Sequence, residues 1–457
     1  MQPENFKFGG GLSSTNLHPL VLLAMLIAIV LIFALPRKYI IVPFLVMAFL
    51  VPLSQQIVLG GVHVLVLRIV TLAGLTRMLF GKQRVLAGGW NSMDTVFLLW
   101  ALFRMTAFIL LNRDMGAVVN QVGFLWDSLG AFFVLRFLIR DDDDIQRLIK
   151  VLSVIAGVVA ICMLNEHFRQ VNVFGILGGV RTVPEIRDGS VRAQGPFAHA
   201  LLAGTFGGIL VPLFVALWIT SKSKVLAAVG LVSSTVITFM SASSTPILAY
   251  VASVVGLCFW PIRRRMRLVR WAVVMALVGL NMVMKAPVWF LIAHIDVVGG
   301  SSADHRAHLV DLFIRNIGDW WLIGTNNAAS WGWDMWDTCN QYVQEGESGG
   351  LATFLCFVAL IVLSFKKIGR GRKAARGSSE REWFFWCLGA AMFANVTAFF
   401  GITYFDQTSV MWYALLAVIA AATLRKSREL PKPRGEEMPL AQTEPAYAPT
   451  FLAGSLG

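Results

Sequence analysis

The chain has 457 residues, of which 57% are hydrophobic and only 14% charged, and its formal net charge is +13. Soluble domains carry about 25% charged residues, so this composition excludes a soluble globular protein and predicts a polytopic membrane protein. The positive charge does not point to a nucleic-acid partner, because most lysines and arginines lie in every second loop between apolar segments.

Thirteen apolar segments are candidate membrane spans, since a transmembrane helix needs about 20 mostly apolar residues. They are residues 18–35, 39–57, 62–80, 93–112, 117–139, 147–165, 198–219, 224–242, 244–261, 268–292, 349–366, 383–402 and 407–424. We therefore expect an all-α fold, a polytopic transmembrane helix bundle of about 13 spans, within a range of about 12 to 14.

The alternation of basic loops predicts the orientation of the chain, because cytoplasmic loops carry the excess of lysine and arginine. It places the N-terminus outside and the C-terminus in the cytoplasm. The expected organisation is an outer tail, a bundle with one outer loop, a large outer loop that forms a small helical cap, the last spans, and a Pro-rich, disordered cytoplasmic tail. These parts are residues 1–17, 18–292 (outer loop 166–197), 293–348, 349–424 and 425–457.

Polar residues in the large loop recur at helical spacing and predict a helix over residues 303–317. Arg306 lies on the apolar stripe of this helix and not on its polar face. It therefore either snorkels to solvent or points into a cavity that holds an anion.

Tryptophans are dense after this helix. They form either an aromatic belt at the membrane surface or a set of faces that stack on sugar rings. The candidates for glycan contact are Trp320, Trp321, Trp333 and Trp336.

Charged residues inside the apolar segments are costly and need a partner or a function. Arg104 and Asp127 lie at similar depths in consecutive spans, so we expect them to form an ion pair. Arg68 and Lys285 lie slightly below the outer ends of their spans with no carboxylate at a matching depth. They are candidates for diphosphate binding, with snorkelling as the alternative.

No metal site or cofactor is expected. His305 and His308 are one helical turn apart, but the sequence supplies no third ligand. The inner loops contain no glycine-rich phosphate loop of the kind that binds nucleotides.

Three segments, in this order, resemble the bacterial O-antigen polymerase and O-antigen ligase superfamily over roughly residues 190–420. The first is the stretch from Arg192 to Phe197 (RAQGPF), and the second is the small-residue turn 241–246 (SASSTP). The third is the large loop, with His305-Arg306 at its start, a Gly324-Thr turn, Asn340-Gln-Tyr, and Glu347-Ser-Gly-Gly before the next span.

The resemblance implies a membrane-embedded C-type glycosyltransferase at the periplasmic face of the bacterial inner membrane. Its donor is a glycan on undecaprenyl diphosphate, and its acceptor is another lipid-linked repeat unit or a lipid A core. Neither metal nor nucleotide is needed, and membrane lipid rather than nucleic acid surrounds the protein. Arg192 and Arg306 match the arginines expected to hold the diphosphate, and Asn340 joins the tryptophans as a glycan-contacting candidate.

Cys339 departs from the family pattern, because the ligases place a catalytic histidine in the Thr338-Cys339-Asn340 segment. The resemblance therefore favours an exopolysaccharide or O-antigen polymerase over a ligase. A transporter or flippase of lipid-linked glycan and a non-catalytic scaffold remain the alternatives from other classes. The candidates for the group that deprotonates the acceptor are His305, His308, Asp337, Glu345 and Glu347.

Overall fold

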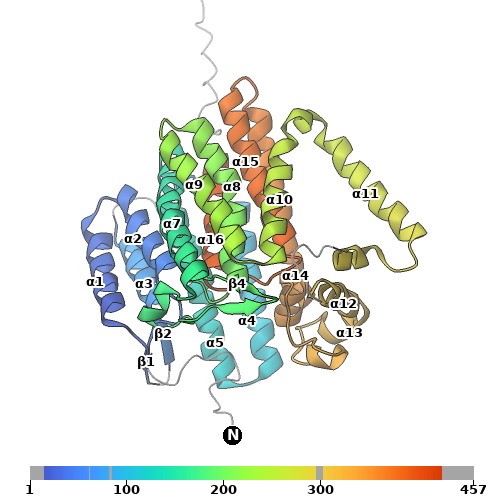
Figure 1. Ribbon diagram of the computed structural model, residues 1–457, viewed down its shortest axis with the longest axis horizontal. Coiled ribbons are helices and arrows are strands. Elements are labelled where there is room, and N and C mark those ends of the chain that lie inside the picture. Colours follow the sequence, from blue (N-terminus) through green and yellow to red (C-terminus); the bar gives the residue numbers. More distant parts are fainter. Residues whose placement is uncertain (1–14, 61, 82–84, 295–301, 425–457) are drawn as a thin grey trace, which may run out of the picture.

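The computed structural model describes residues 15–60, 62–81, 85–294 and 302–424, and most of these residues are helical (Figure 1). The expected cytoplasmic tail, 425–457, and most of the expected outer tail lie outside the described residues.

Each of the thirteen apolar segments contains a helix. These helices are α1 (Pro19–Ala34), α2 (Arg37–Leu50), α3 (Val66–Leu79), α4 (Ser92–Asn112), α5 (Met115–Leu125) continued through the π-helix η2 (Trp126–Gly130) into α6 (Ala131–Leu138), α7 (Asp142–Arg169), α8 (Ala200–Thr220), α9 (Lys224–Met240), α10 (Ser244–Cys258), α11 (Met266–Val283), α14 (Gln341–Ala374), α15 (Ser379–Ala398) and α16 (Asp406–Leu424).

Six helices among the described residues are long and apolar enough to cross a membrane. They are α4, α5–α6, α7, α8, α11 with the preceding 3-10 turn η4 (Trp260–Arg265), and α14. Helices α1, α9 and α10 are apolar but shorter. The chain is therefore a helical protein suited to a membrane, and the count of thirteen spans stays a prediction.

The predominantly helical fold agrees with the all-α expectation, and two short β-hairpins accompany the helices. Strands β1 (Gln56–Leu59) and β2 (Val62–Leu65) pair antiparallel, as do β3 (Glu185–Arg187) and β4 (Ser190–Arg192). The first hairpin occupies residues assigned to the ends of spans 39–57 and 62–80. A short apolar run does not distinguish strand from helix, and Gly60 turns the chain here with φ +58°.

Helix α8 lies at the centre of the bundle and is buried along most of its length. It packs against α7, α9, α10, α15 and α16. Gly204, Gly207 and Gly208 allow this close approach, because a Cβ at each would lie within 3.0 Å of atoms on or beside α9 or α10. Small residues at helix contacts are the usual basis of tight packing in membranes.

Helix α11 stands apart from the bundle (Figure 1) and is exposed on every face in the protein alone. Among the described residues, its main contacts are with η4 and η5 (Val288–His294), the elements beside it in the chain. The expected span 268–292 is therefore divided, since α11 ends at Val283 and η5 occupies its last part.

The large loop forms a small helical cap at the same end of the molecule as β3 and β4 (Figure 1). It contains α12 (Ser302–Arg315), α13 (Ile317–Trp320) and the 3-10 turn η6 (Ala328–Trp331). Apolar residues of this cap pack with the start of α14 in a cluster separate from the bundle core, made of Leu309, Phe313, Trp320, Met335 and Val343.

The Gly324 turn of the cap lies directly on the first turns of α14. A Cβ at Gly324 (φ +87°) would lie 2.1 Å from the carbonyl oxygen of Glu347, so only glycine allows this contact. The Thr325 N–H donates to the same oxygen (2.8 Å), and the Leu351 N–H donates to the Trp321 carbonyl (2.8 Å). Gly350 (φ +69°) provides the kink in α14 that makes room. These two motif segments therefore hold the cap on the bundle.

Candidate functional site

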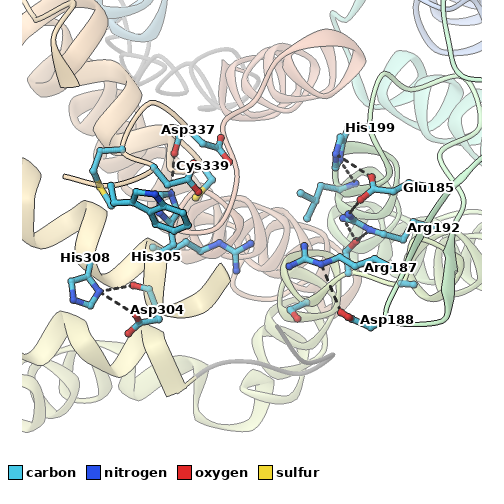
Figure 2. A pocket seen from close by; sticks show the side chains of 18 of the residues that line it. Glu185, Arg187, Asp188, Arg192, His199, Asp304, His305, His308, Asp337 and Cys339 are labelled. Carbon is cyan, nitrogen blue, oxygen red and sulfur yellow. Dashed lines mark hydrogen bonds and ion pairs between the residues drawn. The ribbon is translucent and has the colours of Figure 1, made fainter. Parts of the chain in front are cut away.

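A cavity of about 770 Å³ lies between the bundle and the cap. Its lining comes from the β3–β4 hairpin with the start of α8, from the turn between α9 and α10, and from the cap segment that runs from α12 to Cys339. Figure 2 shows Glu185, Arg187, Arg192 and His199 on one side and the cap residues on the other. All three segments that carry the family resemblance thus meet at this cavity.

Arg192 projects from β4 into the cavity wall and is almost fully buried. Its guanidinium donates to the Ser243 hydroxyl through Nε (3.3 Å) and Nη2 (2.9 Å), and to Glu185 through Nη1 (3.0 Å). Glu185 is opposite Arg192 in the hairpin register. The side chain is therefore held in one orientation by partners from two elements.

The loop after Arg192 is fixed by a buried carboxylate at the end of α7. Glu166 accepts hydrogen bonds from the backbone N–H groups of Gln194 (3.1 Å) and Gly195 (2.8 Å). Gly195 has φ +57°, a backbone conformation that favours glycine. The Ala193 N–H donates to the Met240 carbonyl (3.0 Å), which ties the same loop to the end of α9.

Arg306 lies on α12 and lines the cavity from the cap side. It is only 8% exposed, and its Nε is buried without a hydrogen-bond partner in the described part of the chain. Cys339 lies beside it, and burial raises the pKa of this thiol to about 11 although the Arg306 charge opposes the shift. The Arg306 side chain thus points into the cavity and does not snorkel to bulk solvent.

The cavity lining is not uniformly positive. It contains three arginines, three histidines and five carboxylates, which are Arg187, Arg192, Arg306, His199, His305, His308, Glu185, Asp188, Asp304, Asp334 and Asp337. Glu185 pairs with Arg192, and Asp188 lies 3.8 Å from Arg187. Paired arginines and carboxylates beside an exposed tryptophan offer acceptors for hydroxyl groups and donors for phosphate oxygens at the same site.

His199 caps the N-terminus of α8, where its Nδ1 accepts a hydrogen bond from the Leu201 N–H (3.2 Å). Its Nε2 faces Glu185 at 3.9 Å. Burial, followed by the nearby Arg192 charge, lowers the pKa of His199 below its usual 6.5, so the imidazole is neutral at pH 7.

Three of the five acid–base candidates line the cavity. They are His305, His308 and Asp337, and His305 Nε2 lies 3.1 Å from the Asp337 carbonyl oxygen. Glu345 and Glu347 do not, because α14 begins at Gln341 and holds both carboxylates inside the helix. Glu345 is 0% exposed and accepts from Trp100 and Gln341, and Glu347 accepts from the Thr338 hydroxyl (2.7 Å).

The other two diphosphate candidates lie outside the cavity lining. Arg68 forms two hydrogen bonds to Asp127 (2.9 and 2.6 Å), so the expectation that it lacked a carboxylate was wrong. Arg104, expected beside Asp127, lies instead 3.7 Å from Glu345. Lys285 is exposed in the segment after α11. The depth of a residue along a span does not specify which neighbouring helix its side chain faces. For this reason Asp127 pairs with Arg68 and not with Arg104.

Of the four tryptophans proposed to contact glycan, only Trp333 lines the cavity. Trp333 lines the cavity and is 92% exposed, and Trp336 is exposed nearby in the chain. Trp320 is buried in the cap, stacked on Phe313 at 4.0 Å, and Trp321 lies outside the lining.

Asn340 is a helix cap and not a lining residue. It is fully buried, and its side-chain oxygen accepts from the backbone N–H groups of Tyr342 and Val343 at the start of α14.

Sequence reasoning did not single out Glu185, Ser243 or Glu166, which position Arg192 and its loop. Ser243 lies in the small-residue turn that carries the resemblance, so a signal for it existed. Glu185 and Glu166 belong to no motif, and only the fold brings Glu185 to Arg192 and Glu166 to the loop after it. Among the described residues, no group of three or more His, Cys, Asp or Glu side chains is arranged to hold a metal ion.

No family model matches this chain, and no curated protein sequence matches it.

Proposed function

We propose that this protein is a membrane glycosyltransferase that polymerises undecaprenyl-diphosphate-linked oligosaccharide repeat units at the periplasmic face of the inner membrane. The observation that carries the proposal is the convergence of Arg192 and Arg306 on one cavity from segments more than a hundred residues apart. Carboxylates, histidines and the exposed Trp333 share that cavity, which suits a ligand that is part phosphate and part sugar.

In this proposal, Arg306 supplies the charge that first attracts the diphosphate, because its buried Nε lacks a partner in the described part of the protein. Arg192 is already oriented by Ser243 and exchanges its Glu185 contact for a phosphate oxygen. Cations held in place before the reaction stabilise the negative charge that grows on a departing diphosphate.

His305 is the proposed base. Its Nε2 contacts a carbonyl oxygen, which only accepts hydrogen bonds, so in the neutral ring Nε2 carries the proton and Nδ1 is free to accept one. The acceptor hydroxyl attacks the anomeric carbon and its proton passes to Nδ1. The bond from that carbon to the diphosphate oxygen breaks, and its electron pair leaves with the carrier diphosphate.

A polymerase is favoured over a ligase by the state of Cys339. Its thiol has a pKa of about 11 and is therefore protonated at pH 7. Cys339 thus does not serve as the base that the resemblance assigns to a histidine in the ligases.

Loss of either cavity arginine is the direct test. We expect Arg192→Ala and Arg306→Ala each to lower polymer formation from purified lipid-linked repeats by about 100-fold or more, since removing a group that stabilises transition-state charge costs about 2.7 kcal/mol or more. The measurement is chain length on gels after reaction in proteoliposomes without an ion gradient, which also separates an enzyme from a transporter.

Lys285→Ala is the matched control, because it removes an exposed cation outside the cavity lining. This variant should make full-length polymer. Full-length polymer from both arginine variants would refute the proposed role of the cavity.

A further inference from the structure

A second cavity, of about 260 Å³, lies inside the bundle. Its lining comes from the segment after α2, the junction of β2 and α3, α4, α5 with η2, α14, the α15–α16 connection and the first half of α16. It borders the first cavity, since Cys339 lines one and Gln341 the other, and the Ala198 N–H beside His199 donates to Asp406 of the second (3.1 Å). The proposed function uses none of the residues that line it.

Eight of its eighteen lining residues are aromatic. Trp100 and Phe124 come from α4 and α5, Trp412 and Tyr413 come from α16, and Phe399 and Tyr404 lie in and beside the α15–α16 connection. Aromatic faces of this kind bind apolar surfaces, including the C–H faces of sugar rings.

Arg104 is the one arginine in this lining. Its guanidinium lies over the Phe124 ring (4.5 Å) and 3.7 Å from Glu345, while its Nε is buried without a hydrogen-bond partner in the described residues. A donor left unsatisfied inside a polar cavity is costly. It points to a ligand that brings a hydrogen-bond acceptor.

The carboxylates supply the complementary acceptors. The Glu345 carboxylate already accepts hydrogen bonds from Trp100 (2.7 Å) and Gln341 (2.6 Å) and pairs with Arg104. The Asp127 side chain is paired with Arg68 yet remains 38% exposed, and Asp406 is half-buried. Asp127 is held in the π-helix η2, an irregularity that is frequent at functional sites.

The balance of charge decides the class of ligand. The lining contains one arginine, which pairs with Glu345, and two further carboxylates. No two arginines converge here as Arg192 and Arg306 do in the first cavity, so the lining favours a neutral ligand over a phosphate. Arg104 already covers the face of Phe124, the position that a cationic ligand would take over that ring. A neutral molecule with hydroxyl groups and apolar faces is the remaining match.

We propose that the second cavity is a binding site for one neutral sugar residue, whose hydroxyl groups bond Arg104, Asp127 and Asp406 and whose ring packs on the aromatic wall. The role of that sugar as part of the growing glycan rests on the proposed function, whereas sugar binding itself is independent of it.

Saturation-transfer NMR on the purified full-length protein in nanodiscs tests this site, with glucose, galactose and N-acetylglucosamine as probes. Choline serves as the cationic comparison, and inorganic phosphate, which has no protons to observe, is added as an anionic competitor. We expect saturable transfer from at least one neutral sugar, none from choline, and no loss of the sugar signal when phosphate is added.

Two variants assign the signal to the cavity. Ser409→Phe fills it from α16, and Asp406→Asn keeps the side-chain shape and the contact to Ala198 while removing a charge. Each should weaken sugar binding about tenfold, the loss expected for one strong hydrogen bond or for steric exclusion. Lys285→Ala, which lies outside both cavity linings, should leave sugar binding unchanged.

The proposal is overturned by the absence of saturable transfer from all three sugars, by preferential binding of choline, by loss of the sugar signal when phosphate is added, or by signals that both cavity variants retain. Sugar binding in a protein that makes no polymer would refute the proposed function and leave this site standing.

Discussion

Arg192 and Arg306 share a cavity, but the protein holds them differently. Ser243 and Glu185 bond Arg192 along most of its guanidinium, whereas Arg306 keeps an unbonded Nε beside Cys339. A buried charged group without acceptors is unfavourable. We therefore expect a bound anion to stabilise the folded protein chiefly through Arg306, and Arg192 to contribute orientation.

The neutral state of His199 gives a pH prediction at this scale. Burial and then Arg192 lower its pKa in the folded protein, with Glu185 opposing the shift. As the pH falls through about 6.5, the unfolded chain takes up a proton at His199 before the folded protein does. His199 therefore leaves the free energy of unfolding unchanged above about pH 6.5 and lowers it as the pH falls further.

The variant His199→Asn should remove this pH-dependent loss, because asparagine also caps a helix N-terminus but does not titrate. The measurement is the thermal unfolding midpoint in detergent between roughly pH 7.5 and pH 5. The wild-type midpoint should fall more steeply below pH 6.5 than that of the variant. Parallel curves would mean that His199 has an unshifted pKa.

At the scale of elements, the position of α8 depends on its glycines. Gly208 meets backbone atoms of α10 at two points, since a Cβ there would lie 2.9 Å from the Tyr250 nitrogen and 3.0 Å from the Pro246 carbonyl oxygen. Backbone atoms cannot turn aside as a side chain can. The turn between α9 and α10 that carries Ser243 is thus coupled to the packing of α8.

We expect Gly208→Ala to lower the free energy of unfolding by about 1–3 kcal/mol, the usual cost of inserting a methyl group into a packed core. Gly279→Ala is the control, because nothing lies within 4 Å of a Cβ at that position in α11. The control should be neutral or stabilising by up to about 1 kcal/mol, as for glycine-to-alanine changes within a helix. Equal thermal unfolding midpoints for the two variants would contradict the packing argument.

At the scale of the whole molecule, the first cavity and the basic loops lie at opposite ends. The cap and the β3–β4 hairpin occupy one end (Figure 1). At the other end, Arg263 of η4 and Arg372 of α14 both form ion pairs with Glu382 of α15 at 3.3 Å. This separation agrees with the loop alternation in the sequence, which predicts that the cap faces outward.

Cysteine labelling measures that orientation. We expect a membrane-impermeant maleimide to label Ser330→Cys in the cap of intact spheroplasts, and to label Ser379→Cys, at the start of α15, only after lysis. Both positions are exposed, and the parent should carry Cys258→Ser, because Cys258 is itself exposed. The reverse pattern would place the cap in the cytoplasm and remove the lipid-linked substrate from reach.

Local features of the chain were predictable from its sequence because they depend on neighbouring residues. Apolar content located the helices, and helical spacing predicted residues 303–317, where α12 spans Ser302–Arg315. The Arg306 side chain could be placed on the apolar face of that helix from periodicity alone. Whether this side chain reaches solvent or enters a cavity depends on which segment packs against that face. The sequence does not specify that segment.

Partners across the bundle were decided only by the tertiary structure. Arg68 bonds Asp127 because α3 packs against η2. Arg104 approaches Glu345 because α4 packs against α14, although these two helices are more than two hundred residues apart. Periodicity gives a residue its depth along a helix but not the neighbour that it faces, and apolar surfaces in a membrane do not select a partner as they do in water. The sequence by itself therefore determined the helical, membrane-suited character of the chain and the segments that carry its polar residues. Only the packing of those segments decided that Arg192 and Arg306 meet at one cavity while Arg68, Lys285, Glu345 and Glu347 lie elsewhere.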